Sequence, residues 1–218
     1  MKTKRLLVFI ICSFCILGGC GQTDTVKALL KKAEHGNAEA QYLYACNLYE
    51  KAFYKSDYKL SFLWFEKAAE QNHASAQNKL SFLYSTGTGI EKDLKKAFYW
   101  QTKSAENGLR LAQQQLGDDY YRGLKGVVKK DINKAIYWYQ KAAEQGDDVS
   151  AAQLGHIYEG TAPGARDLSK RHKWKGQDYE KAIYWYEKSI KLGNVLHEKA
   201  RKQIDELREL IKKDSLNR

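Results

Sequence analysis

Two patterns of apolar and polar positions alternate along most of this chain. The first surrounds a Trp, as in KAIYWYQKAAEQG at 134–146, and related segments occupy 60–72, 96–108 and 181–193. The second places Ala, Leu and Tyr four residues apart, as in 116–120 and 154–158 and, more loosely, 80–84 and 44–48. This spacing puts the apolar residues on one face of a helix. We therefore predict an all-α fold in which two kinds of helix alternate.

Residues that start and stop helices flank these patterns. Asp57, Asp93, Asp131 and Asp178 precede the Trp-containing segments, where a carboxylate can cap free N–H groups. Gly108, Gly146 and Gly193 follow them, as a left-handed C-cap requires. The glycine-rich segments 87–89 and 123–126 recur between the two kinds of helix, so we interpret them as turns and not as phosphate loops.

The tryptophans reveal a repeat. Trp64, Trp100, Trp138 and Trp185 follow one another at 36, 38 and 47 residues, a period typical of solenoids. Burial of each Trp is worth about 4–6 kcal/mol as an upper bound, and the small residue after the Leu of the second pattern would allow a neighbouring helix to approach closely. The predicted segments are a half-repeat at 25–36, repeats at 37–72, 73–108, 109–146 and 147–194, and a capping helix and tail at 195–218.

These motifs resemble the Sel-like repeat family, a relative of the tetratricopeptide repeats. The resemblance rests on A-x-A-x-x-x-L-G-x-x-Y followed by D-x-x-K-A-x-x-W-Y-x-K-A-A-E-x-G and covers about residues 36–194. It implies a right-handed α-solenoid of helix-turn-helix repeats, a tetratricopeptide-like superhelix, that binds proteins and is not an enzyme. The first repeat lacks the glycines between its helices, and the fourth carries an insertion at 161–177.

The amino terminus resembles a bacterial lipoprotein signal. Basic residues precede the apolar run Leu6–Leu17, which is too short to span a bilayer, and Leu17-Gly18-Gly19-Cys20 resembles a lipobox. By this resemblance, 1–19 is a signal peptide, Cys20 is lipidated, and 20–24 is a short tether. We expect a protein anchored in the cell envelope, on the outer membrane and facing the periplasm. An ordinary signal peptide with an incidental Cys is the alternative.

The family implies that the first helix of each repeat lines a concave partner-binding face. Helical spacing places one set of residues off the buried side of these helices: Tyr42, Cys46, Tyr49, Asn78, Phe82, Ser85, Gln114, Asp118, Tyr121, His156 and Glu159. Aromatic residues among them are of the kind that dominates interfaces. Packing against the next repeat is the alternative role for each.

The insertion at 161–177 is the second candidate surface. It is basic and contains one Trp, and its candidate partner-binding residues are Arg166, Lys170, Arg171, Lys173, Trp174 and Lys175. A basic loop on a rigid scaffold suits recognition of an acidic patch or of membrane headgroups. A solvated charged loop with Trp174 packed on the following helix is the alternative.

Charge and composition narrow the class of partner. The net charge is +11, and loss of Lys2, Lys4 and Arg5 with the signal would leave +8. We expect a protein partner with an acidic patch and no nucleic acid, because the basic residues are interleaved with Glu. The scattered histidines and the single Cys of the folded part, Cys46, form no metal motif, so no metal or cofactor is expected. A monomer is favoured.

Three functions follow from the resemblance. Some bacterial members of the family are lipoproteins that act as immunity proteins against secreted lipase-type toxins, and this is the most specific prediction. An envelope scaffold, adaptor or signalling regulator is the alternative. Enzymatic action is the least favoured: cysteine-rich members linked to β-lactam binding or hydrolysis carry a Cys pair in each repeat, which this chain lacks.

Overall fold

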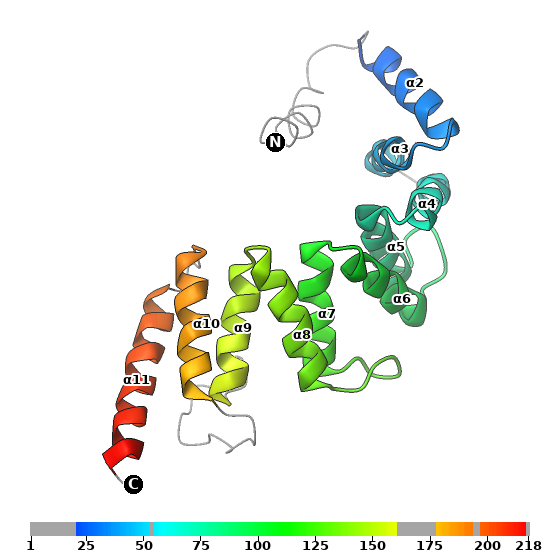
Figure 1. Cartoon of the computed structure of the whole chain (residues 1–218). Coiled ribbons are helices and arrows are strands. Elements are labelled where there is room, and N and C mark those ends of the chain that lie inside the picture. The colour runs from blue at the N-terminus through cyan, green and yellow to red at the C-terminus, as the bar shows by residue number, and fades with distance from the viewer. Residues whose placement is uncertain (1–20, 53–54, 161–177, 194–196, 217–218) are drawn as a thin grey trace. The chain divides into compact units, whose positions relative to one another are not determined.

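A computed structural model describes residues 21–52, 55–160, 178–193 and 197–216. Ten α-helices lie within these ranges (Figure 1): α2 (Gly21–Glu34), α3 (Ala38–Lys51), α4 (Lys55–Glu70), α5 (Ala74–Thr86), α6 (Leu94–Glu106), α7 (Arg110–Arg122), α8 (Ile132–Glu144), α9 (Asp148–Glu159), α10 (Tyr179–Lys191) and α11 (His197–Leu216). A single antiparallel β-bridge, between Leu124 and Val128, is the extended pairing in these ranges. The all-α prediction is confirmed.

The helices pair as helix-turn-helix repeats. We call α3, α5, α7 and α9 the A helices, and α4, α6, α8 and α10 the B helices. The chain divides into two compact units, residues 1–100 and 101–218. In the first unit α2 packs against α3, α3 against α4 and α4 against α5, and in the second unit each helix from α7 to α10 packs against the next one. None of the described helices combines the length and hydropathy that crossing a bilayer requires.

In three of the four repeats the residue after the Trp lies in the core of the hairpin, whereas Gln101, which follows Trp100, is half-buried. Phe65, Tyr139 and Tyr186 are 0%, 1% and 2% exposed, whereas Trp64, Trp100 and Trp138 are half-buried. Trp185 alone among the four repeat tryptophans is buried. The prediction that a buried Trp holds each repeat is therefore wrong for three of the four repeats.

The small residue of the A helix makes room for this ring. A Cβ atom added to Gly117 would lie 2.7 Å from the ring of Tyr139, and one added to Gly155 would lie 2.6 Å from the ring of Tyr186. These distances are shorter than any van der Waals contact allows. The predicted close approach is confirmed, and the group that approaches is a tyrosine ring of the B helix.

The helix ends follow the predicted caps with one exception. Asp131 and Asp178 accept hydrogen bonds from the N–H groups of the third residue after them, each at 3.0 Å, and Asp93 caps α6 in the same way. Asp57 lies inside α4, which begins at Lys55, so its predicted role as an N-cap is wrong. Gly146 has a φ of 87°, in the left-handed region that glycine favours.

The two terminal helices differ from the repeats. Helix α2 begins at Gly21, so residues 21–24, which we expected to form a tether, are helical. Helix α11 packs on α10 through Ile204 and Leu207, which are 4% and 0% exposed. It therefore covers the apolar side of the last repeat with an otherwise charged helix, as a cap must.

Candidate protein-binding surface

In the first unit, Tyr42 belongs to a contact that joins two repeats. Its half-buried ring stacks on the imidazole of His73, with centroids 4.7 Å apart. His73 begins α5, and its Nδ1 accepts a hydrogen bond from the N–H of Ala76 at 3.2 Å. The proton must then sit on Nε2, which donates to Glu39 at 3.0 Å. One face of the Tyr42 ring is thus used for packing between repeats, which was the alternative to partner binding in the sequence analysis.

Among the other predicted residues of the first unit, only Phe82 is exposed. Tyr49 is half-buried, with the Tyr58 ring 5.0 Å away and Lys79 Nζ 5.5 Å from its centroid. Burial, and secondarily Tyr58, raises the pKa of the Tyr49 hydroxyl. Asn78 is half-buried on α5, and Phe82, one turn further along, is 47% exposed. Phe82 is thus the most accessible aromatic residue that the prediction placed on this unit.

In the second unit, Asp118 is engaged by its own repeat. Its carboxylate accepts a 2.6 Å hydrogen bond from the hydroxyl of Tyr139. Burial and this hydrogen bond raise the pKa of Tyr139. Gln114 and Tyr121 are half-buried on the same helix, and Lys130 Nζ lies 5.2 Å from the Tyr121 ring centroid. Gln114 and Tyr121 are therefore partly open to a partner, whereas Asp118 has a structural partner already.

His156 and Glu159 form a buried polar cluster with α10 and α11. The hydroxyl of Tyr186 donates to Glu159 Oε2 at 2.7 Å and lies 2.8 Å from His156 Nδ1. Gln203 of α11 donates to Glu159 Oε1 at 2.5 Å. Because the tyrosine hydroxyl donates its one hydrogen to the hydrogen bond with the carboxylate, it accepts from His156, and Nδ1 of His156 is the donor in that contact. The cluster joins three helices.

Glu159 is the predicted residue that the structure places differently. We expected its side chain to lie off the buried face, but it is 0% exposed. The physical reason is that Tyr186 and Gln203 both donate to its carboxylate, which compensates for the loss of water. His156 is half-buried, and burial, with Lys199 as the second cause, lowers its pKa to about 4.

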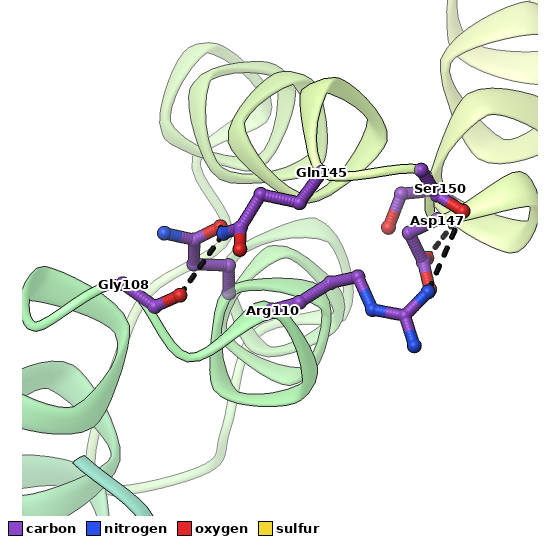
Figure 2. A network of polar contacts seen from close by, with 7 residues as sticks. Gly108, Arg110, Gln145, Asp147 and Ser150 are labelled. Atoms are coloured by element: carbon purple, nitrogen blue, oxygen red, sulfur yellow. Dashed lines mark hydrogen bonds and ion pairs between the residues drawn. The ribbon is translucent and has the colours of Figure 1, made fainter. Parts of the chain in front are cut away.

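A glutamine clamp between helices was not predicted. Gln113 of α7 donates to the carbonyl of Ala105 at 3.1 Å, and Gln145 donates both to Gln113 Oε1 at 2.8 Å and to the carbonyl of Gly108 at 3.0 Å. Beside it, Arg110 reaches across the turn to Asp147 at 3.7 Å (Figure 2). The pair Ala112-Gln113 is visible in the sequence and recurs at 40–41 and 76–77, but the acceptor of the Gln is a backbone carbonyl, which no side-chain pattern reveals.

The first unit contains the same clamp. Gln41 donates to the carbonyl of Ala33 at 3.0 Å, and Gln71 donates to Gln41 Oε1 at 2.7 Å. Three consecutive helices, α2, α3 and α4, are tied together in this way. The clamp is therefore a local device that holds one repeat to the preceding helix.

Sequence reasoning also missed an exposed tyrosine on the B helices. Tyr99, Tyr137 and Tyr184 are 53%, 51% and 56% exposed. Each directly precedes a repeat Trp, and this adjacency was the signal available in the sequence. Their position on the solvent side of an amphipathic helix is one where polar residues are usual.

Two predicted sites lie outside the described residues. They are the lipidation site, Cys20, and the basic insertion with Arg166, Lys170, Arg171, Lys173, Trp174 and Lys175. Across the described ranges, no group of three or more His, Cys, Asp or Glu side chains is placed to hold a metal ion. The described surface is thus defined by accessible aromatic and amide groups on A helices and by tyrosines on B helices.

Comparison with known proteins identifies the repeat. The Sel1 repeat model matches residues 38–73, 74–109, 110–147 and 173–194, more than half of the chain. A comparison with curated protein sequences finds no match.

Solved structures give the same fold. The chain is similar to a Sel1 repeat protein from Oxalobacter formigenes, with 34% identity over 80% of this chain and a TM-score of 0.62. It is also similar to a protective antigen with an SLR fold from uropathogenic Escherichia coli, with 31% identity over 79% of this chain and a TM-score of 0.62. Cysteine-rich protein B of Helicobacter pylori is 25% identical over 63% of this chain and 100% of its own, with a TM-score of 0.49. The chain spans 66% of the first protein and 34% of the second, less than two thirds of each.

Proposed function

This chain belongs to the Sel1 repeat family, and from this premise we propose that it is a non-enzymatic module that binds another protein through its A helices. The observation that carries the proposal is the exposure of Phe82. At the equivalent position of α7 and α9, Asp118 and His156 are held by tyrosine hydroxyls of the B helices. Helix α5 instead presents an aromatic ring that is 47% exposed, the kind of group that forms the centre of protein interfaces.

A matched pair of substitutions tests the A-helix surface. Phe82 is 47% exposed on an A helix, and Leu60 is 46% exposed on the B helix α4. With a photo-crosslinking residue at either position of the full chain in its own cells, we expect position 82 to capture a protein partner. Phe82→Ala should then weaken binding of that purified partner at least tenfold, about 1.4 kcal/mol, while Leu60→Ala should not. Equal effects of the two substitutions would contradict the proposal.

We further propose that the module is held at a membrane of the cell envelope by lipid on Cys20. The basic start, the short apolar run and the Leu-Gly-Gly-Cys ending support this, and two or more acyl chains give stable anchoring. Labelled palmitate should be incorporated by the natural chain and not by Cys20→Ala. Incorporation that is equal in both would argue against the anchor, and it would leave the A-helix surface unaffected.

The specific form that we propose is an immunity protein. It would bind a secreted toxin in the periplasm and cover the toxin's active site or its membrane-docking surface. The net positive charge suits a toxin with an acidic surface. Co-production with each secreted protein encoded beside this chain should show protection from at least one of them, and Phe82→Ala should reduce that protection while Leu60→Ala should not. If no neighbouring secreted protein is toxic or bound, the module serves another partner and the immunity form is wrong.

A further inference from the structure

The B helices carry a second, repeated surface of one tyrosine and one lysine. Tyr137 and Tyr184 each stand at the sixth residue of a 13-residue helix in the second unit, α8 and α10. A lysine follows each of them by four residues, so Lys141 and Lys188 lie one turn further along the same face. Tyr99 with Lys103 repeats this pattern in α6. We call these pairs the tyrosine–lysine steps.

Each tyrosine ring is held in place although it is exposed. Tyr137 meets the ring of Trp138 edge-on at 4.9 Å, and Tyr184 meets Trp185 at 5.1 Å. Tyr99 meets Trp100 in the same geometry at 5.1 Å. The neighbouring indole thus restricts the orientation of each ring, which reduces the entropy cost of binding. Over the described residues, the hydroxyls of Tyr137 and Tyr184 have no hydrogen-bond partner.

The lysines lie over the same aromatic groups. Lys141 Nζ is 5.9 Å from the centroid of Tyr137, and Lys188 Nζ is 4.7 Å from that of Trp185. The steps of α8 and α10 therefore each present a phenol hydroxyl and an ammonium group one turn apart, and both groups can donate hydrogen bonds. Lys141 Nζ also lies 3.9 Å from Glu144 Oε2, an exposed ion pair that an acidic partner would compete with. In α10 the exposed Lys191 continues the face of Tyr184 and of the half-buried Lys188. The equivalent position of the first repeat is Lys67, so all four repeats have a lysine there.

From this geometry we propose that the tyrosine–lysine steps of α8 and α10 dock a carboxylate-rich protein surface. Two donors next to an exposed aromatic ring are complementary to acidic side chains set among apolar ones, and tyrosine is enriched among the residues that dominate interface energies. Both helices pack on α9, so a partner can meet two equivalent steps on one compact unit. This inference rests on the proposal that the chain binds protein, but it assigns a surface on the B helices and not on the A helices.

The test uses the full chain in its own cells. A benzophenone amino acid replaces Tyr137 or Tyr184 in two variants, and in two others it replaces Phe82, on the A-helix surface, or Gln115, an exposed residue of α7 that serves as control. Any protein joined through position 137 or 184 is identified, purified and titrated against the natural chain and its variants. We expect it to carry a cluster of Asp or Glu at the crosslinked site. We also expect Tyr184→Ala and Lys188→Glu each to weaken binding at least tenfold, and Gln115→Ala to leave it unchanged.

Salt and a conservative substitution separate the two donors. Affinity should fall as ionic strength rises, because screening weakens exposed charge pairs. Tyr184→Phe keeps the ring and removes the hydroxyl, so its loss of affinity should be smaller than that of Tyr184→Ala. A folding control is the helical circular dichroism of each variant.

Several results would overturn the inference. A partner captured from position 82 but from neither tyrosine position would refute this surface and leave the A-helix proposal standing. Capture of lipid or polysaccharide at 137 and 184 would show that the steps serve another class of ligand. Binding that does not change on Tyr184→Ala, or that is insensitive to salt, would equally refute a carboxylate-rich partner. No protein captured from any of the three positions would refute both proposals.

Discussion

The hydroxyl of Tyr139 donates a 2.6 Å hydrogen bond to the carboxylate of Asp118. This contact joins a B helix to its own A helix across the gap that Gly117 leaves open. The next repeat has a corresponding contact, in which the hydroxyl of Tyr186 meets polar groups of its own A helix, His156 and Glu159. In the first repeat, Phe65 has no hydroxyl, and the residue at the position of Asp118 is Cys46. The pairing therefore adds a polar contact to a hydrophobic junction.

Removal of this hydroxyl should destabilise the second unit. Tyr139→Phe keeps the ring against Gly117 and leaves Asp118 without its donor. Because Asp118 is half-buried and can regain water, we expect the free energy of unfolding to fall by about 1–2 kcal/mol. Urea unfolding followed by circular dichroism measures the change. Tyr137→Phe, which removes an exposed hydroxyl, is the control and should change stability by less than about 0.5 kcal/mol; equal losses would contradict the assigned role.

A methyl group on the A-helix glycines should be costly. Gly155→Ala would place a Cβ 2.6 Å from the Tyr186 ring, and we expect a loss of about 1–3 kcal/mol from overpacking. In a Tyr186→Ala background the same methyl group meets no ring. The cost of Gly155→Ala should therefore become smaller there or change sign, and a double-mutant cycle measures the coupling. Additive effects would mean that the ring and the glycine do not constrain each other.

Acid should weaken the cluster around His156. Burial, and secondarily Lys199, lowers the pKa of His156 to about 4 in the folded chain, against about 6.5 in the unfolded chain. The unfolded chain then binds more protons between these values, so the unfolding free energy falls as pH drops from 6.5 to 4. The contribution of His156 between pH 7 and 4.5 is about 2–3 kcal/mol.

A neutral variant isolates this contribution. His156→Gln retains a side-chain N–H that can donate to Tyr186 and does not titrate. The unfolding free energy of each chain is measured by urea titration at pH 7 and at pH 4.5. The loss of stability between the two pH values should be smaller in His156→Gln than in the natural chain, by about the same 2–3 kcal/mol. An identical pH dependence in both chains would show that other groups titrate in this window.

The glutamine clamp can be tested by comparing two glutamines of the same helix, α7. Gln113 is 5% exposed and donates to the carbonyl of Ala105, whereas Gln115 is exposed. Gln113→Ala removes one of the two donors to the Ala105 carbonyl, which still accepts from the N–H of Gly108 at 3.1 Å, and it also removes the side-chain acceptor of Gln145. We expect a cost of about 1–2 kcal/mol from these two lost hydrogen bonds, while Gln115→Ala should be nearly neutral. Amide hydrogen exchange at the start of α7 should quicken only in the first variant, and equal exchange rates would refute the clamp.

The sequence patterns predicted the helices well because a helix depends mainly on local spacing and caps. Asp131 and Asp178 cap their helices through residues three positions away, which a local pattern contains. The prediction for Asp57 failed because a helix capped by Asp57 would begin at residue 58, whereas α4 begins three residues earlier, at Lys55. Local rules thus identify a helix more reliably than its first residue.

Side-chain burial was predicted less well because it depends on neighbours distant in sequence. Trp138 and Tyr139 are adjacent, and both suit a buried position, but only Tyr139 faces the space above Gly117. Glu159 reads as a surface residue, and it is buried because Gln203, 44 positions later, donates to it. A local sequence pattern does not show which distant residue will donate to a given side chain. For the same reason, it did not predict the backbone carbonyls that accept from the glutamine clamp.

The glutamine clamp has a consequence for how such an array can grow. Gln41 and Gln113 recognise main-chain oxygens, which every preceding helix offers whatever its side chains. In a duplicated repeat that carries this glutamine, the side chain could donate to a backbone carbonyl of the preceding helix without any substitution in that helix. The fourth repeat has Ala151 at this position, and the side-chain hydrogen bonds of its A helix run instead to particular residues of the following helices, Tyr186 of α10 and Gln203 of α11. The early part of the chain is thus suited to lengthening by duplication, whereas its end is bound to one sequence.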